Sequence, residues 1–216
     1  MRYGRYGHLL VAITVSACFL LATVGSAQTV DQYDLVGDIN WAVHSSSDIG
    51  QTFTPSAAGT LVGIELALSR CSTPANPLVL DILRVSGGVP QPSPVLASVQ
   101  IPNTSIPPTL PPSSLVLGSV TGTYVDLTSY DIAVQPTEQY AFRLNTAEGV
   151  CYATRGDTVG AYAGGQRFTA WTPDPSNDLV FKTFLQPAVP VPASSPLAAL
   201  LLLAAVAGAG YFFLRR

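Results

Sequence analysis

Two apolar runs, separated by a short polar segment, stand at residues 61–90, which read LVGIELALSRCSTPANPLVLDILRVSGGVP. In the first run, Ile64, Leu66 and Leu68 are spaced two apart, and side chains two apart lie on one face of a strand. In the second run, LVLDILRV, both faces are mainly apolar, which indicates a largely buried strand. A Gly-Gly pair and Pro90 then form a turn signal. The stretch therefore predicts two strands of a β-sheet protein.

Runs of this kind recur through the middle of the chain, where no segment has an apolar helical stripe of useful length. Nine runs predict strands: 51–54, 61–68, 78–85, 95–101, 124–127, 139–144, 150–154, 167–171 and 179–184. Turn signals lie between them, at 58–59, 86–90, 148–149, 164–165 and 173–175. Many short strands with such turns are typical of an all-β sandwich or barrel, and we expect an antiparallel, jelly-roll-like β-sandwich.

The charges are unevenly distributed along the 216 residues, which have a formal net charge of −3 and only 11% charged residues. Residues 28–186 contain all thirteen acids against six basic residues, a formal charge of −7, and the other four arginines lie at the two chain ends. Without a surplus of Lys and Arg, nucleic-acid binding is excluded as a function. The pattern is that of an acidic domain between two apolar segments with basic ends.

The N-terminal segment 1–27 is predicted to be a secretory signal peptide. Two arginines precede an apolar run at 9–24, and the small residues 25–27 follow it, so we expect cleavage before Gln28. Two other interpretations are an uncleaved transmembrane anchor and a lipoprotein modified at Cys18. The apolar residues that continue after Cys18 argue against the lipoprotein.

The C-terminal segment 197–214, LAALLLLAAVAGAGYFFL, has no charge over 18 residues. As a helix it would be about 27 Å long, close to the ~30 Å hydrocarbon core of a bilayer, so we expect a transmembrane helix. A buried core helix is the alternative. The basic cap Arg215 and Arg216 should stay cytoplasmic, which places the acidic domain outside the membrane. The Pro-rich segment 187–196 cannot continue a strand or a helix and is expected to be an extended linker, so the ectodomain is 28–186.

Cysteine usage agrees with export. Removing the signal peptide leaves Cys71 and Cys151, both at the ends of predicted strands. An even pair in an oxidising compartment predicts one disulfide, and two separate buried thiols are the alternative. Two distant cysteines and one histidine do not make a tetrahedral zinc site.

Catalytic motifs are absent from the sequence: it contains no H-E-x-x-H, P-loop or G-x-S-x-G pattern. His44, beside Ser45 and Asp48, is interpreted as part of a polar loop, because residues so close in sequence rarely converge as a triad. A hydrolase using two carboxylates, such as Glu65 and Asp81, is an alternative, although Glu65 is expected to face solvent. We therefore expect no enzyme, no catalytic residue and no cofactor.

The sequence has two acidic clusters. The first follows the signal peptide, and the second precedes the last predicted strand. Their residues are Asp31, Asp34, Asp38 and Asn40 in the first, and Asp174, Asn177 and Asp178 in the second. Calcium favours such oxygen ligands, but neither cluster has the spacing of an EF-hand loop. We interpret the clusters as solvated turn residues and assign no metal ligand, with a structural calcium ion as the alternative.

Four aromatic residues provide the only hint of ligand binding. They are Tyr152, Tyr162, Phe168 and Trp171, in or next to a Gly-rich stretch. Exposed aromatic rings on a β-sandwich can stack on sugars, but aromatic side chains more often fill a core. We expect them to be core residues.

Several motifs in the middle of the chain resemble the exported bacterial choice-of-anchor domains. They are QTFTP (51–55), AGTL (58–61), IEL (64–66), LDI (80–82), VSGGVP (85–90), VLAS (95–98) and QYAFRL (139–144). The resemblance implies a surface-displayed β-sandwich, similar in shape to carbohydrate-binding modules. The family offers no catalytic residues to transfer to this chain.

The tail resembles the bacterial C-terminal sorting signals of the PEP-CTERM and IPTL-CTERM groups, in which a short Pro-containing motif, one helix and terminal arginines follow one another. Val189, Pro190, Val191 and Pro192 stand where those families have their signature, but the Glu of one signature and the Ser-Glu-Trp of the other are missing. The resemblance implies processing by an exosortase-type membrane protease. Two outcomes are open, removal of the tail or its retention as an anchor.

Together these features predict a non-enzymatic extracellular protein, anchored in the membrane or sorted to the cell surface, that interacts with extracellular polysaccharide or matrix. A structural matrix component without a ligand and a secreted glycan-active hydrolase are the alternatives.

Overall fold

The computed structural model describes residues 27–71, 73–109, 114–115, 118–147, 149, 151–160 and 162–188. The predicted signal peptide (except Ala27), the sorting motif at Val189, Pro190, Val191 and Pro192, the predicted helix 197–214, and Arg215 and Arg216 lie outside these residues. Within the described ranges, no helix is both long enough and apolar enough to cross a membrane.

Strands are the main regular structure of the described chain. They are β1 (Thr29–Asp34), β2 (Ile39–Val43), β3 (Ile49–Phe53), β4 (Gly59–Leu66), β5 (Leu68–Arg70), β6 (Leu78–Ser86), β7 (Val89–Ile101), β8 (Thr123–Asp126), β9 (Ile132–Val134), β10 (Tyr140–Thr146), β11 (Tyr152–Asp157), β12 (Arg167–Thr169), β13 (Thr172–Asp174), β14 (Asp178–Leu179) and β15 (Phe181–Pro187). Two short 3-10 helices, η1 (Asn103–Ser105) and η2 (Thr128–Tyr130), lie in the connections. Every pairing between these strands is antiparallel, which confirms the prediction of an antiparallel all-β fold.

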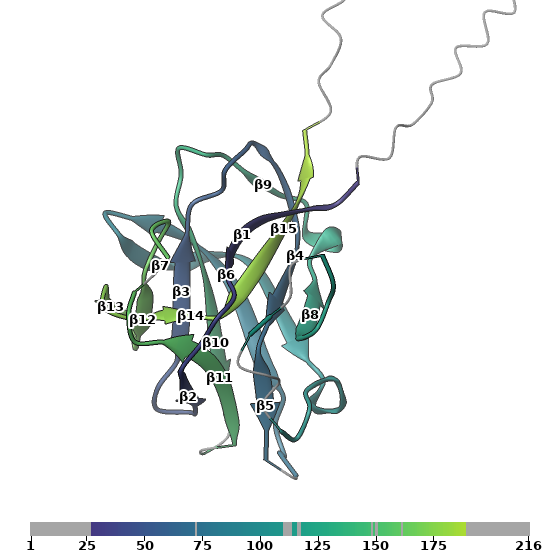
Figure 1. Ribbon diagram of the computed structural model, residues 1–216, viewed down its shortest axis with the longest axis vertical. Coiled ribbons are helices and arrows are strands. Elements are labelled where there is room, and N and C mark those ends of the chain that lie inside the picture. The colour runs from purple at the N-terminus through teal and green to yellow at the C-terminus, as the bar shows by residue number, and fades with distance from the viewer. Residues whose placement is uncertain are drawn as a thin grey trace, which may run out of the picture.

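Three sheets enclose one hydrophobic core (Figure 1). One sheet has the order β13-β12-β3-β10-β6-β7; the second has β1-β15-β4-β8, with β9 also on β4; the third has β14-β11-β2, with β5 also on β11. The second and third sheets are joined at bends, because β4 leads through Ala67 into β5 and β14 leads through Val180 into β15. The backbone of Arg155 spans both bends, donating to Ala67 O and accepting from Val180 N, each at 3.0 Å. The arrangement is β-sandwich-like.

Aromatic rings fill the centre of the core. The ring of Phe181 on β15 lies 6.5 Å from that of Phe53 and 5.5 Å from that of Phe142, both on the six-stranded sheet, and 5.1 Å from that of Tyr162. Because these rings come from both sides of the core, the packing holds the sheets together. Burial of this apolar area is the main stabilising contribution.

The two runs that first indicated the fold lie where their patterns predict. Ile64, Leu66 and Leu68 are all fully buried in the core, although Leu68 belongs to β5 in the next sheet. Strand β6 is buried on both faces over most of its length, and Leu83 on its outer face packs in a smaller cluster with Phe168.

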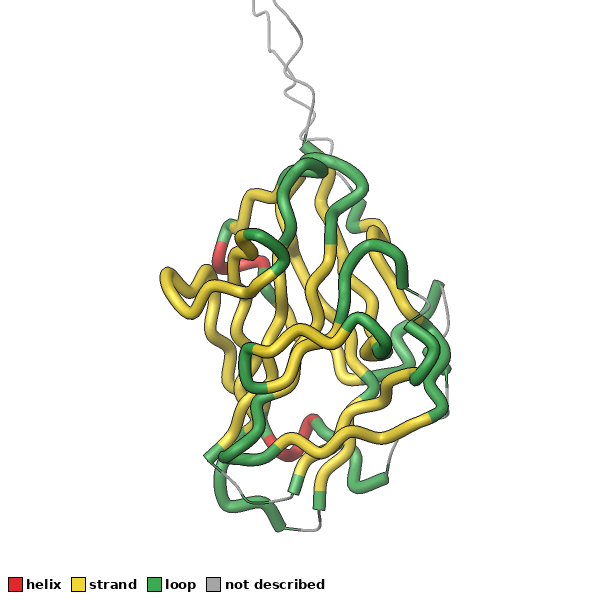
Figure 2. The backbone as a smooth tube through the Cα atoms, turned by 90° about the vertical axis from the view of Figure 1, so that its left-hand side faces the viewer, coloured by secondary structure: helices red, strands yellow, loops and turns green. Residues whose placement is uncertain are grey.

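Both ends of the described chain lie at one tip of the domain (Figures 1 and 2). The first strand, β1, pairs with the last strand, β15, and Thr29 stands opposite Leu185. Contrary to the expectation for the Pro-rich linker, Pro187 belongs to β15 and stands opposite Gly59. Proline is tolerated there because it comes at the end of the strand, where only one ladder donor is lost.

Some predicted strand boundaries were wrong. Strands β1, β2, β9 and β13 lie outside the predicted runs. The predicted strand 167–171 ends at Thr169, and Ala170 and Trp171 form a tight turn with φ angles of 46° and 68°. Strand β13 then returns through the Pro-Asp-Pro segment that had been interpreted as a turn.

Candidate functional site

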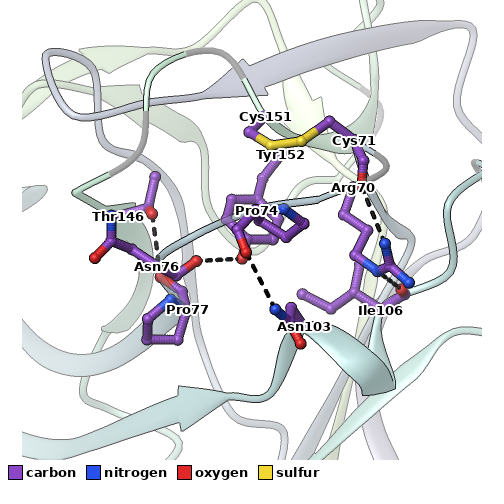
Figure 3. The surroundings of a disulfide bond; sticks show 10 residues. All are labelled: Arg70, Cys71, Pro74, Asn76, Pro77, Asn103, Ile106, Thr146, Cys151 and Tyr152. Atoms are coloured by element: carbon purple, nitrogen blue, oxygen red, sulfur yellow. Dashed lines mark hydrogen bonds between the residues drawn. A yellow bond between two sulfur atoms is a disulfide. The ribbon is translucent and has the colours of Figure 1, made fainter.

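A disulfide joins Cys71 and Cys151, as predicted (Figure 3). Cys71 follows β5 and Cys151 precedes β11, and these neighbouring strands bring the two Cα atoms to 4.9 Å. A backbone hydrogen bond of 2.7 Å from Cys71 N to Cys151 O continues the ladder. Strand β5, which Cys71 follows, lies toward the end of the domain opposite the tip where β1 begins and β15 ends (Figure 1).

Hydrogen bonds hold the loops around the disulfide. The hydroxyl of Tyr152 donates to the carbonyl of Asn76 at 2.5 Å, and Asn103 Nδ2 donates to the carbonyl of Pro74 at 3.2 Å. Arg70 Nε donates to the carbonyl of Ile106 at 2.8 Å (Figure 3). In each of these hydrogen bonds a side chain donates to a backbone carbonyl, so the contacts hold the loops in place.

Glu65 is fully buried, so the expectation that it faces solvent was wrong. It forms an ion pair of 2.5 Å with Lys182, which is also fully buried. The other carboxylate oxygen accepts from the backbone amides of Thr121 and Gly122 at 2.7 and 2.6 Å. The expected alternation of buried and exposed side chains along β4 did not predict this burial, because Lys182 on β15, which is itself buried, stands directly opposite Glu65.

Asp81, the other carboxylate of the hydrolase alternative, is on a different sheet. Its oxygens accept from Ser98 at 2.6 Å and from Asn145 at 2.8 Å, and it forms an ion pair of 2.5 Å with Arg143. The Arg143 guanidinium also lies over the ring of Trp171, 4.7 Å from its centre. Glu65 and Asp81 are therefore each neutralised by a basic side chain, and the structure does not bring them together.

His44 lies in a polar turn, as predicted. Its Nδ1 is 2.9 Å from Ser46 Oγ, and its carbonyl accepts from Ser47 N at 2.9 Å. Asp48 instead forms an ion pair with Arg143 at 3.2 Å. These residues do not assemble a catalytic triad.

The four aromatic residues are used for packing. Tyr152 and Phe168 are 2% and 0% exposed, and Tyr162 lies edge-on against Phe181. Trp171 is partly buried and stacks on Phe168 with 6.4 Å between ring centres. The interpretation as core residues is confirmed for Tyr152 and Phe168, and none of the four is among the exposed large hydrophobic residues.

The structure divides the two acidic sequence clusters. Asp31 accepts from Ser56, Asp38 accepts from Thr158, and Asp174 forms an ion pair with Arg167, as expected for acids that fix turns. Asp34 and Asp178, however, come together with a third residue, Asp157. One carboxylate oxygen from each lies within 4.8 Å of the others, and we call these residues the three-acid cluster.

Strand register places the three-acid cluster at one corner of the fold. Asp157, the last residue of β11, stands directly opposite Asp178 on β14. Asp34, the last residue of β1, stands opposite Phe181 at the start of β15. The bend at Val180 between β14 and β15 therefore brings Asp34 to the other two acids.

Neutral donors hold two of these carboxylates. Asp157 Oδ1 accepts from the amides of Val159 and Gly160 at 3.0 and 2.8 Å. Asp178 accepts from Gln51 Nε2 at 2.7 Å and from Tyr162 N at 2.9 Å. Among the described residues, no basic side chain forms an ion pair with any of the three acids.

Burial without a cation perturbs the titration of two of the acids. Desolvation, together with a hydrogen bond to Asp157 and the charges of Asp157 and Asp178, raises the pKa of Asp34 to about 7, against a smaller opposing contribution from the Val36 amide. Desolvation also raises the pKa of Asp178, and the charges of Asp157 and Asp174 add to this effect. Burial is the largest cause of both shifts, and the neighbouring negative charges add to it.

A pocket of about 460 Å³ opens beside the cluster and is lined by Tyr33, Asp34, Leu35, Val36, Asp38, Asp157 and Val159. Asp34 and Asp157 thus connect the buried carboxylates to the surface. The arrangement does not suit glycoside hydrolysis, in which two carboxyl groups about 5–9.5 Å apart must reach the sugar. Here both oxygens of Asp178 accept hydrogen bonds from protein donors, and Asp34 Oδ2 is sealed from solvent.

A scan against protein-family models gives no match, and a search of curated proteins gives no significant relative. Asp34 and Asp178 belong to the two acidic clusters of the sequence, whereas Asp157 was not predicted as a site residue. The one available signal was a Gly-Asp pair just beyond a predicted strand, which by itself is common at strand ends.

Proposed function

We propose that this protein is a non-enzymatic, exported domain displayed at the cell surface, where it interacts with extracellular polysaccharide or matrix. In this proposal, segment 197–214 anchors or sorts the protein, an exosortase-type protease processes the tail, and residues 28–186 form a jelly-roll-like ectodomain.

The pairing of the first strand with the last is the observation that carries the proposal. With Thr29 opposite Leu185, the predicted signal peptide and the predicted anchor join the domain at the same tip. The domain would then project from the membrane, with strand β5 toward its far end (Figure 1). A chain tethered at one tip leaves its remaining surface available to the exterior.

The disulfide also supports export, because such bonds persist mainly in oxidising compartments. Glu65 and Asp81 are each held in an ion pair with a basic side chain, which favours a binding or structural role over the hydrolase alternative.

The second candidate is a purely structural matrix component without a ligand. The burial of Tyr152 and Phe168 favours it, since those rings are not available to stack on sugars. In the polysaccharide-binding role, the rings available to stack on sugars are those of Tyr33 and Tyr130, which are exposed.

Two measurements test the proposal. Mass spectrometry of the protein recovered from its native host should give a mature N-terminus at Gln28 and membrane or cell-surface association, and an unprocessed chain in the cytosol would disprove export. A glycan array probed with the exported protein should show binding to extracellular polysaccharide. Absence of binding to every glycan on the array would favour the structural matrix component.

A further inference from the structure

We propose that Asp34, Asp157 and Asp178 bind a calcium ion that links β1, β11 and β14. This inference rests on the geometry of the three-acid cluster and holds wherever the protein acts. None of the three contributes to an ion pair elsewhere in the described structure.

The unsatisfied oxygen of Asp34 is the first argument for a ligand. Asp34 Oδ2 is shielded from solvent and has no neutral donor among the described residues, and the neighbouring group that the Asp34 side chain meets is the Asp157 carboxylate. Burying a carboxylate oxygen without a donor or a cation is unfavourable, and buried charges are normally paired or bound to metal. Two further carboxylates, at Asp157 and Asp178, are 7% and 1% exposed and face the same place, so either a proton on one of them or a bound cation must relieve the repulsion between the three.

The ligand type and spacing favour calcium. All available ligands are oxygens, which suit calcium and magnesium rather than zinc. Calcium–oxygen distances of about 2.3–2.6 Å place two ligands of one ion up to about 5 Å apart, whereas magnesium allows only about 4.2 Å. The three oxygens lie within 4.8 Å of one another, so they can close around one ion, and the longer bonds of calcium need the smaller adjustment.

The remaining coordination positions face the adjacent pocket. Calcium takes six to eight oxygens, and three carboxylates provide between three and six of them. Asp34 and Asp157 both line the pocket of about 460 Å³, so water can reach the ion from that side. Asp38 on the pocket wall adds negative potential near the entrance, which favours entry of a cation.

The experiment uses the protein as purified from its host, stripped with EGTA and titrated with CaCl₂ or MgCl₂ by calorimetry and thermal unfolding. A calcium concentration 100-fold above Kd should raise Tm by about 5–10 °C, and magnesium at the same concentration should have a smaller effect. Absence of both binding heat and Tm shift at 5 mM calcium would overturn the proposal. An equal shift with magnesium would overturn the assignment to calcium.

Variants locate the site. Asp34→Asn should lose the calcium response, and in EGTA its Tm should be no lower than that of the wild type because a like charge has been removed. Asp157→Asn is the second variant, since its amide oxygen can still accept from Val159 and Gly160. Asp131→Asn is the matched control: it removes the same charge at an exposed left-handed position that Asn tolerates, and should retain the wild-type response. Wild-type calcium affinity in both Asp34→Asn and Asp157→Asn would place the ion elsewhere and refute the inference.

Discussion

At the scale of single residues, the ion pair between Glu65 and Lys182 is the most deeply buried ion pair of the described structure. Each side chain is fully buried, and Lys182 Nζ also donates to the carbonyl of Ser119 at 2.7 Å. With the Thr121 and Gly122 amides on Glu65, the pair fixes the loop before β8 against β4 and β15. Such a pair adds little net stability compared with apolar residues, but its two members depend on each other.

Lys182→Met should therefore destabilise the protein by about 3–5 kcal/mol, because it leaves the Glu65 carboxylate buried without a cation. Adding Glu65→Gln, whose amide oxygen can still accept from Thr121 and Gly122, should recover most of this loss. Urea unfolding of the wild type, the single variant and the double variant measures both effects.

Arg84→Gln is the control for that experiment. It breaks the exposed ion pair of 2.9 Å with Glu138 and should cost no more than about 1 kcal/mol. If Lys182→Met unfolded at the same urea concentration as Arg84→Gln, the buried pair would not have the role assigned to it.

At the scale of elements, the predictable strands were those whose side chains have a buried face. Strand β6 has mainly apolar residues on both faces over its buried length and was predicted from Leu78 to within one residue of its end. Strand β1, with sequence TVDQYD, has few apolar residues because it lies at a sheet edge and pairs only with β15. Its position is set by tertiary pairing, which local pattern does not encode.

The same limit applies to the candidate sites. Cys71 and Cys151 could be predicted as a pair because covalent chemistry and compartment leave few alternatives. The three-acid cluster could not be predicted, since it depends on the register of Asp157 with Asp178 and on the bend at Val180. Glu65 was misjudged because its partner Lys182 comes from a strand more than 100 residues later.

Removing the disulfide tests how strongly it holds β5 to β11. The Cys71→Ala/Cys151→Ala variant should be less stable by about 2–4 kcal/mol. The bond joins residues with a sequence separation of 80, and without it the unfolded chain gains conformational entropy. Urea unfolding with and without dithiothreitol measures the loss. The reduced wild type should match the double variant, and the variant itself should not respond to reductant. Equal midpoints for the oxidised wild type and the variant would contradict this assignment.

At the scale of the whole molecule, both ends of the domain meet in one sheet. Strand β15 pairs with β1 on one side and with β4 on the other, so it closes the fold that begins at the N-terminus. Phe181 and Leu185 on this strand are 0% and 2% exposed and belong to the main core. The chain must therefore be complete to Pro187 before the core can form.

This dependence predicts a sharp boundary for truncation. A chain that stops after Ala188 keeps every described strand, including the contact from Ala188 N to Ala58 O at 3.4 Å, and should unfold cooperatively with a Tm within about 2 °C of the full protein. A chain that stops after Val180 lacks β15, exposes the partners of Phe181 and leaves β1 unpaired, so it should show no cooperative transition. Thermal unfolding followed by circular dichroism distinguishes the two. Loss of cooperative unfolding in the longer chain would mean that residues beyond Ala188 are part of the folded unit, and the domain boundary near Gln186 would be wrong.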